Sequence, residues 1–277
     1  MSKQSDHNNT DTDEGREGMS FWAHLEELRG HLVRSFIAIF LLAIGAFIAK
    51  DIIFDYVILA PKEPYFITNR AFCYFSRLIS TPALCINQNP VEIINIELAG
   101  QFKTHIIVSL IAGIIVAFPY ILYEFWRFIK PALHPKEKAN SRGAVLVTSL
   151  LFLTGVSFSY FLIAPLTINF LGSYQVSSMV ANQIALRSYI TTVTMVTFAT
   201  GLVFELPIIV YFLSRVGLLT PEFMKKNRKV AFILIIGLSA IITPPDVFSQ
   251  ILVGIPLYVL YEISIGISRR VNKEQEI

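Results

Sequence analysis

Residues 189–213 read YITTVTMVTFATGLVFELPIIVYFL, and this stretch decides the fold. Its 25 residues would form a helix about 38 Å long, more than the roughly 30 Å of hydrocarbon in a bilayer. Glu205 is the only charged side chain between Ser188 and Ser214. A carboxylate at this depth is costly unless it faces a polar partner, a cavity or the protein interior. The stretch therefore predicts a transmembrane helix that carries one functional acidic residue.

The rest of the chain has the composition of a membrane protein, with 277 residues of which 54% are hydrophobic and 16% charged. Continuous apolar runs indicate helices, because a membrane β-barrel would show short alternating segments. The fifth predicted span has only 13 residues and would be about 20 Å long. We expect an all-α membrane protein with six transmembrane helices, at 33–49, 105–125, 143–165, 189–213, 230–242 and 247–267.

Charge placement predicts the orientation. With the N-terminus inside, the inner segments hold 17 of the 23 lysines and arginines, and the outer segments hold six. This is the positive-inside pattern, so both termini are expected in the cytoplasm and the chain in the cytoplasmic (inner) membrane. The net charge is only +3, and the basic residues flank helix ends, where they suit lipid headgroups. No nucleic-acid partner is expected.

The predicted domain organisation is simple. Residues 1–18 are polar and are expected to form a disordered tail. A single six-helix membrane domain covers 19–268 and includes an extracytoplasmic cap at 51–104, and 269–277 form a short cytoplasmic tail. Cys73 and Cys85 are the only cysteines, and both lie in the cap. An oxidising compartment favours a disulfide between them, with two separate thiols as the alternative.

Two polar features outside residues 189–213 need an interpretation. His24, Glu27 and His31 share one face of the first helix, but no second ligand cluster accompanies them, so no metal and no cofactor are expected. Pro244, Pro245 and Asp246 form a tight turn between the last two spans, where prolines fix the backbone and the acid suits a helix N-terminus.

Several segments in this order resemble the TatC family of the twin-arginine protein translocase. The first three matching segments are HLEELR (24–29), FPYILY (118–123) and the run through Trp126 and Phe128 to PAL (131–133). The others are FELP (204–207), TPPDVFSQ (243–250), IPL (255–257) and YE (261–262). The resemblance covers roughly residues 20–268. It implies six spans, of which the fifth and sixth are short helices. The six helices together are expected to form a concave cup.

The resemblance further implies a receptor that is not an enzyme. Such proteins bind the twin-arginine signal peptides of folded cargo at the cytoplasmic face. They assemble with single-span TatA/TatB-type partners and with further copies of themselves, and the proton motive force drives export. Glu27 and Glu137 match the two acidic positions that bind the arginine pair. Arg29 and Phe128, which lie in matching segments, are expected to contact the signal peptide as well. A guanidinium fork suits carboxylates better than an ammonium group does.

Two departures and one alternative remain. The outer loop is longer than is usual in the family, and Gln101 stands where many relatives carry an acid. The alternative function is an ion-coupled small-molecule transporter that uses Glu205. For Glu205 itself three roles stay open: lining a polar hollow, contacting a partner helix together with Pro207 and Gln250, or relaying protons. The spans contain no paired carboxylates or Ser/His pair that would indicate an enzyme.

Overall fold

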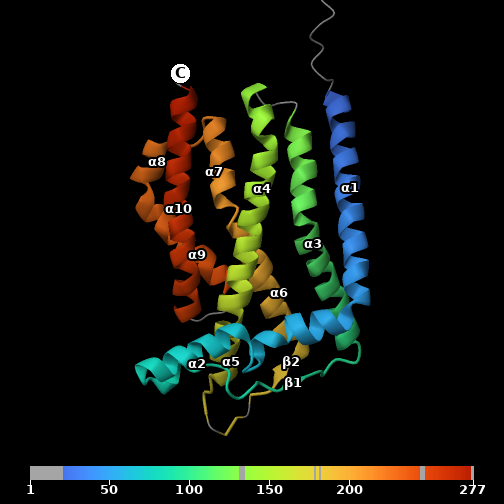
Figure 1. The fold of residues 1–277 in the computed structure, drawn as a ribbon, viewed down its shortest axis with the longest axis vertical. Coiled ribbons are helices and arrows are strands. Elements are labelled where there is room, and N and C mark those ends of the chain that lie inside the picture. Colours follow the sequence, from blue (N-terminus) through green and yellow to red (C-terminus); the bar gives the residue numbers. More distant parts are fainter. Residues whose placement is uncertain (1–20, 131–134, 178, 181, 244–246, 276–277) are drawn as a thin grey trace, which may run out of the picture.

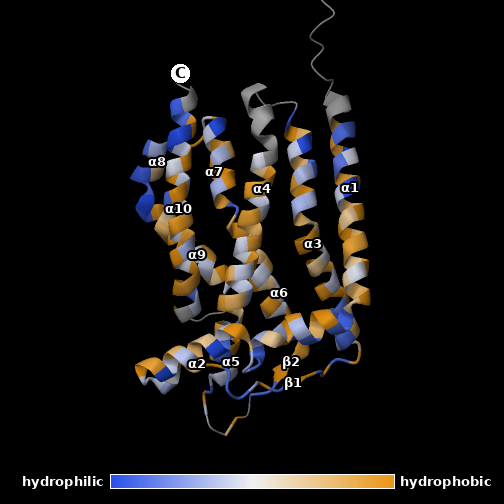
Figure 2. Ribbon diagram, in the orientation of Figure 1, coloured by the Kyte–Doolittle hydropathy of each residue, from blue (hydrophilic) through white to orange (hydrophobic). Residues whose placement is uncertain are grey.

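The computed structural model describes residues 21–130, 135–177, 179–180, 182–243 and 247–275. Five helical segments in it are long and apolar enough to cross a membrane: Leu25–Ile48, Gly100–Ile129, Gly143–Ser173, Leu186–Arg215 and Ser249–Lys273. They run roughly side by side, and short elements lie across one end of the bundle (Figure 1). Apolar residues dominate the middle of these helices, and polar residues gather toward the opposite end (Figure 2). The expected helical membrane protein is thus confirmed.

The helices follow in a simple order. The first two long helices are α1 (Phe21–Ile48) and α3 (Gly100–Ile129). The next span is α4 (Pro135–Phe158), which passes through a π-helical turn, η5 (Ser159–Ile163), into α5 (Ala164–Ser173). The last group is α6 (Leu186–Val203), α7 (Leu206–Arg215), α8 (Pro221–Lys226), α9 (Arg228–Ile242) and α10 (Val247–Gln275). The start of α1 and the end of α10 lie at the same end of the bundle, which we call the terminal end (Figure 1).

Small residues bring the spans into close contact. A Cβ on Gly113 of α3 would lie 2.7 Å from the backbone nitrogen of Ala43 on α1. A Cβ on Gly155 of α4 would lie 2.7 Å from the ring of Phe204, which follows α6. In a bilayer, helix association depends on such close packing, because lipid tails are as apolar as the helices themselves. Both glycines are therefore required by the packing.

The opposite end of the bundle, the cap end, is covered by the segment between α1 and α3. It contains η1 (Ile52–Ile58), η2 (Ala60–Lys62), α2 (Ile67–Ile79), η3 (Pro82–Leu84) and β1 (Ile93–Ile94). Strand β1 pairs in parallel with β2 (Ile184–Ala185), with Ile93 opposite Ile184. No local sequence pattern predicts this pairing of the cap with the loop before α6.

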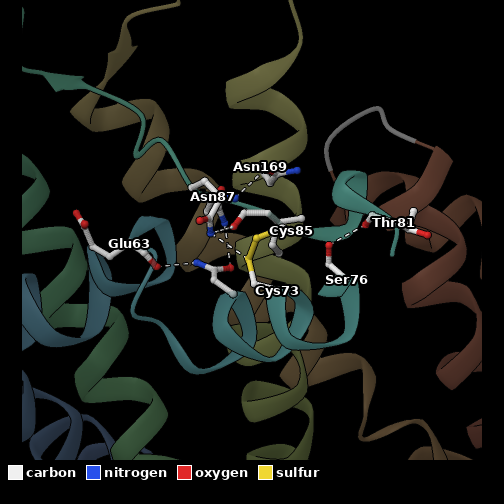
Figure 3. The surroundings of a disulfide bond; sticks show 10 residues. Glu63, Cys73, Ser76, Thr81, Cys85, Asn87 and Asn169 are labelled. Atoms are coloured by element: carbon white, nitrogen blue, oxygen red, sulfur yellow. Dashed lines mark hydrogen bonds between the residues drawn. A yellow bond between two sulfur atoms is a disulfide. The ribbon is translucent and has the colours of Figure 1, made fainter. Parts of the chain in front are cut away.

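A disulfide between Cys73 and Cys85 ties α2 to the segment after η3 (Figure 3). Beside it, Asn87 donates to the carbonyl of Pro165 at 3.0 Å, and its backbone N–H donates to Asn169 at 3.0 Å. These bonds fix the cap to α5. At its edge, half-buried Glu97 pairs with Arg187 at 3.2 Å, and the hydrogen bond from that guanidinium lowers the pKa of the Glu97 carboxyl.

The two last predicted spans, both expected to be short, have different lengths in the structure. Helix α9, the predicted fifth span, has 15 residues and is about 22 Å long, so it is too short to cross the hydrocarbon unaided. The expectation of a short sixth helix is wrong, because α10 has 29 residues. It contains Pro256 without ending there, and it continues through the basic segment that was expected to be a tail. Residues 1–18 lie outside the described residues.

Candidate functional site

A buried charged cluster joins α1 to α3 near the terminal end of the bundle. Glu124 of α3 is only 2% exposed, and its Oε2 lies 2.5 Å from Nδ1 of His31, which is also buried. Nε of Arg34 donates to the same oxygen at 3.2 Å. Because charges are rarely buried without partners, this cluster fixes the register of α1 against α3.

Glu27 lies one helical turn before His31 on α1 and is half-buried. Its Oε2 is shielded from solvent and accepts no hydrogen bond from any described residue. A shielded carboxylate oxygen without a donor is costly to keep in a folded protein. Its presence suits a site that an incoming cation or hydrogen-bond donor completes.

The other predicted signal-binding residues are placed as follows. The ring of Phe128 on α3 meets the ring of His31 edge-on, with centroids 6.0 Å apart. Phe128 is thus linked to α1 through His31, one helical turn from Glu27, whereas Arg29 of α1 is exposed to solvent. Glu137 belongs to the first turns of α4, but its side chain is outside the described part of the structure.

Glu205 occupies the break between α6 and α7. It is 8% exposed, and both of its carboxylate oxygens are buried. The backbone amide of Phe152 on α4 lies near this carboxylate, but neither oxygen accepts a hydrogen bond of normal geometry from a described residue. Pro207 stands in the first turn of α7, which explains the break, because proline cannot donate to the preceding turn. Glu205 thus faces the protein between α4 and the α6–α7 break.

The remaining predicted residues lie elsewhere. Nε2 of Gln250 on α10 donates to the carbonyl of Ile236 on α9 at 3.1 Å, so it links the last two helices. Pro244, Pro245 and Asp246 lie outside the described residues. Within the described ranges, no group of three or more His, Cys, Asp or Glu side chains could hold a metal ion.

Glu124 is not among the residues that the sequence singles out. It is the only Asp, Glu, Lys or Arg between Lys103 and Arg127, so the signal that singled out Glu205, one charge in a long apolar stretch, was also present there. Its partners on α1 are 90 and 93 positions away in the sequence, and only the packing of the two helices brings them together.

The family model described as "Sec-independent protein translocase protein (TatC)" matches residues 23–256 of the chain. The TatC protein of Blattabacterium sp. subsp. Periplaneta americana is 40% identical over 259 residues, covering 93% of this chain and 97% of that protein. The TatC protein of Desulforapulum autotrophicum is 35% identical and covers 92% and 86%, respectively.

Two solved structures, both described as the twin-arginine translocase receptor TatC, have the same fold as the chain. One superposes with a TM-score of 0.64 at 34% identity, covering 90% of this chain and 99% of that one. The other, described as solved in DDM, gives a TM-score of 0.68 at 34% identity, covering 87% and 97%.

Proposed function

Since the chain belongs to the TatC family, a component of the twin-arginine protein translocase, we propose that it is the subunit that binds twin-arginine signal peptides. The family consists of translocase components and not of enzymes, and the chain is a multi-pass membrane protein. An ion-coupled transporter is not retained as a function, because the family assignment covers most of the chain.

The observation that carries the proposal is the shielded oxygen of Glu27, to which no described residue donates. Glu27 lies one turn from His31, whose ring contacts that of Phe128. A signal-peptide arginine would supply the missing donor and charge, and the aromatic ring offers its guanidinium a flat apolar contact. Glu137, at the start of α4, takes the second arginine. Each shielded charge-assisted contact would contribute about 1.5–3 kcal/mol.

The orientation follows from the distribution of basic residues. The terminal end of the bundle faces the cytoplasm, with both termini there, and the cap faces the opposite compartment. The chain resides in the cytoplasmic (inner) membrane. Helix α9 serves as a short fifth of six spans around a concave cup, where neighbouring helices or a thinned bilayer compensate for its length.

Glu205 acts in assembly with TatA/TatB-type single-span partners. The proton motive force then drives export of the cargo by the assembled complex. A buried carboxylate without a full hydrogen-bond partner can receive a donor from a partner's transmembrane helix. Glu205→Ala should therefore impair partner assembly and transport, and leave twin-arginine binding largely intact. Loss of precursor binding as large as that of a Glu27 variant would contradict this division of roles.

The decisive experiment measures binding of a twin-arginine precursor to the purified protein. Glu27→Gln should weaken binding about 10-fold or more, the equivalent of one lost charge-assisted contact. Glu26→Gln is the matched control, because Glu26 is the exposed neighbour on the same helix. A photocrosslinker at position 27 or 137 should capture the signal peptide. If neither position crosslinks and Glu27→Ala plus Glu137→Ala leaves binding intact, the proposal is wrong.

A further inference from the structure

Helix α2 of the cap turns its apolar face outward, whereas an amphipathic helix of a soluble domain turns that face toward the core. Its large apolar side chains point away from the protein, with Ile67 69%, Tyr74 67% and Leu78 70% exposed. These residues recur at three- and four-residue spacing and so share one face. With Ala71 and Phe75, which are also exposed, they form what we call the α2 stripe.

The opposite face of α2 is polar, and the protein uses it. Asn69, Cys73 and Ser76 are displaced by two positions from the stripe, a rotation of about 200°. Asn69 is fully buried and donates to the carbonyls of Pro61 at 3.0 Å and Glu63 at 2.8 Å. Ser76 donates to the carbonyl of Thr81 at 2.7 Å, and Cys73 forms the disulfide (Figure 3). The orientation of the stripe is therefore fixed by the bonds of the other face.

The depth of α2 follows from its contact with a spanning helix. Thr68 donates to the carbonyl of Phe161, and the ring of Phe66 stacks on that of Phe161 with centroids 5.9 Å apart. The span begins at Gly143, so Phe161 lies about 27 Å along it at about 1.5 Å per residue. A bilayer has about 30 Å of hydrocarbon, so α2 starts at the boundary between acyl chains and headgroups.

The direction of α2 and its flanking charges agree with this depth. The helix runs across the direction of the spans at the cap end (Figure 1). Phe161 itself is 44% exposed, so the apolar surface of the span continues onto the cap. Arg70 and Arg77 are exposed on one flank of the stripe, about 60° or more from its centre. From there their guanidinium groups can reach lipid phosphates while the stripe contacts acyl chains.

We infer that α2 is an interfacial helix whose stripe is embedded in the bilayer leaflet at the cap end, with Arg70 and Arg77 on phospholipid phosphates. A strongly amphipathic helix with apolar and aromatic residues on one face and arginines beside it has the composition of helices that lie in the headgroup region. The disulfide and the Asn69 bonds hold it there as a rigid part of the cap. The inference does not depend on signal-peptide binding.

The test places a fluorescent reporter in the stripe. Tyr74→Trp is compared with Tyr174→Trp, a matched control that is 62% exposed at the end of α5, well beyond Phe161 along the chain. The full chain is reconstituted at low protein density in phosphatidylcholine–phosphatidylglycerol vesicles, with or without bromine atoms near the top of the acyl chains. The emission of the two native tryptophans, measured in the parent protein, is subtracted.

Emission from Tyr74→Trp should fall in brominated vesicles and resist aqueous iodide, whereas Tyr174→Trp should show the reverse. Leu78→Trp, one turn further along the stripe, should behave like Tyr74→Trp. If iodide quenches Tyr74→Trp as strongly as Tyr174→Trp, the stripe faces water and the inference is wrong. If neither bromine nor iodide quenches it, protein covers the stripe, as a second copy or a partner helix would, and the lipid contact is equally refuted.

Discussion

Replacing Glu124 by Leu tests whether the buried cluster holds α1 against α3. The change removes the acceptor of the hydrogen bonds from His31 at 2.5 Å and Arg34 at 3.2 Å, and the partner of the exposed Tyr120 hydroxyl. The bond to buried His31 contributes about 1.5–3 kcal/mol. The Arg34 side chain is 45% exposed, so solvent screening limits its share to about 1 kcal/mol or less. After allowing for the apolar gain from Leu, we expect a loss of about 2–3 kcal/mol in the free energy of unfolding.

The assay is reversible unfolding of the purified protein in mixed micelles, titrated with a denaturing detergent. Glu262→Leu is the control, because its ion pair with Arg228 at 2.7 Å is exposed and should contribute about 1 kcal/mol or less. Adding His31→Leu to Glu124→Leu should recover most of the loss, since no buried polar partner is then left unpaired. A loss below about 0.5 kcal/mol for Glu124→Leu, or losses that simply add in the double variant, would refute the reasoning.

Further predictions concern packing, the cap and Glu205. Gly155→Ala should destabilise the protein by about 1–3 kcal/mol because the new methyl meets the Phe204 ring, whereas Gly266→Ala, with open space around it, should be neutral or stabilising in the same titration. Reducing the cap disulfide should lower stability by about 2–3 kcal/mol, measured with and without reductant. The Glu97 ion pair should stabilise the protein at neutral pH and cease to do so as acidification passes the lowered pKa; Arg187→Gln should raise that pKa in a carboxyl NMR titration. Glu205→Leu should leave stability unchanged or raise it while transport falls, because the carboxylate is buried and no described residue gives it a hydrogen bond of normal geometry.

The sequence was informative where length and charge alone decide the outcome. In a bilayer, the backbone N–H and C=O groups of an apolar stretch of about 20 residues are all hydrogen-bonded only when the stretch forms a helix. The four spans before α9 and the last span were therefore predictable. Pro207 marks the position of the break between α6 and α7, because the missing N–H of proline interrupts the helical ladder. The cost of burying a lone carboxylate drew attention to Glu205.

Other features depend on packing that no local pattern specifies. The spacing of Ile67, Tyr74 and Leu78 indicates an apolar stripe, but periodicity does not say which face of α2 meets the protein. That choice is made by the hydrogen bonds of Asn69. In the same way, the pairing of Glu124 with His31 requires the register of α1 on α3, which Gly113 helps to set through its close approach to α1.

The parallel pairing of β1 with β2 has a consequence for biogenesis. Its two strands are separated by all of α3, α4 and α5, and the Ile184 N–H donates to the carbonyl of Glu92 at 3.2 Å across the pair. In the proposed orientation both loops have to cross the bilayer before this bond can form, so the pairing is a late step of assembly. An intermediate that has not yet inserted α6 would carry a partly closed cap, open to proteases and to quality control outside the membrane. A completed cap therefore indicates that α3, α4 and α5 are already inserted in the membrane.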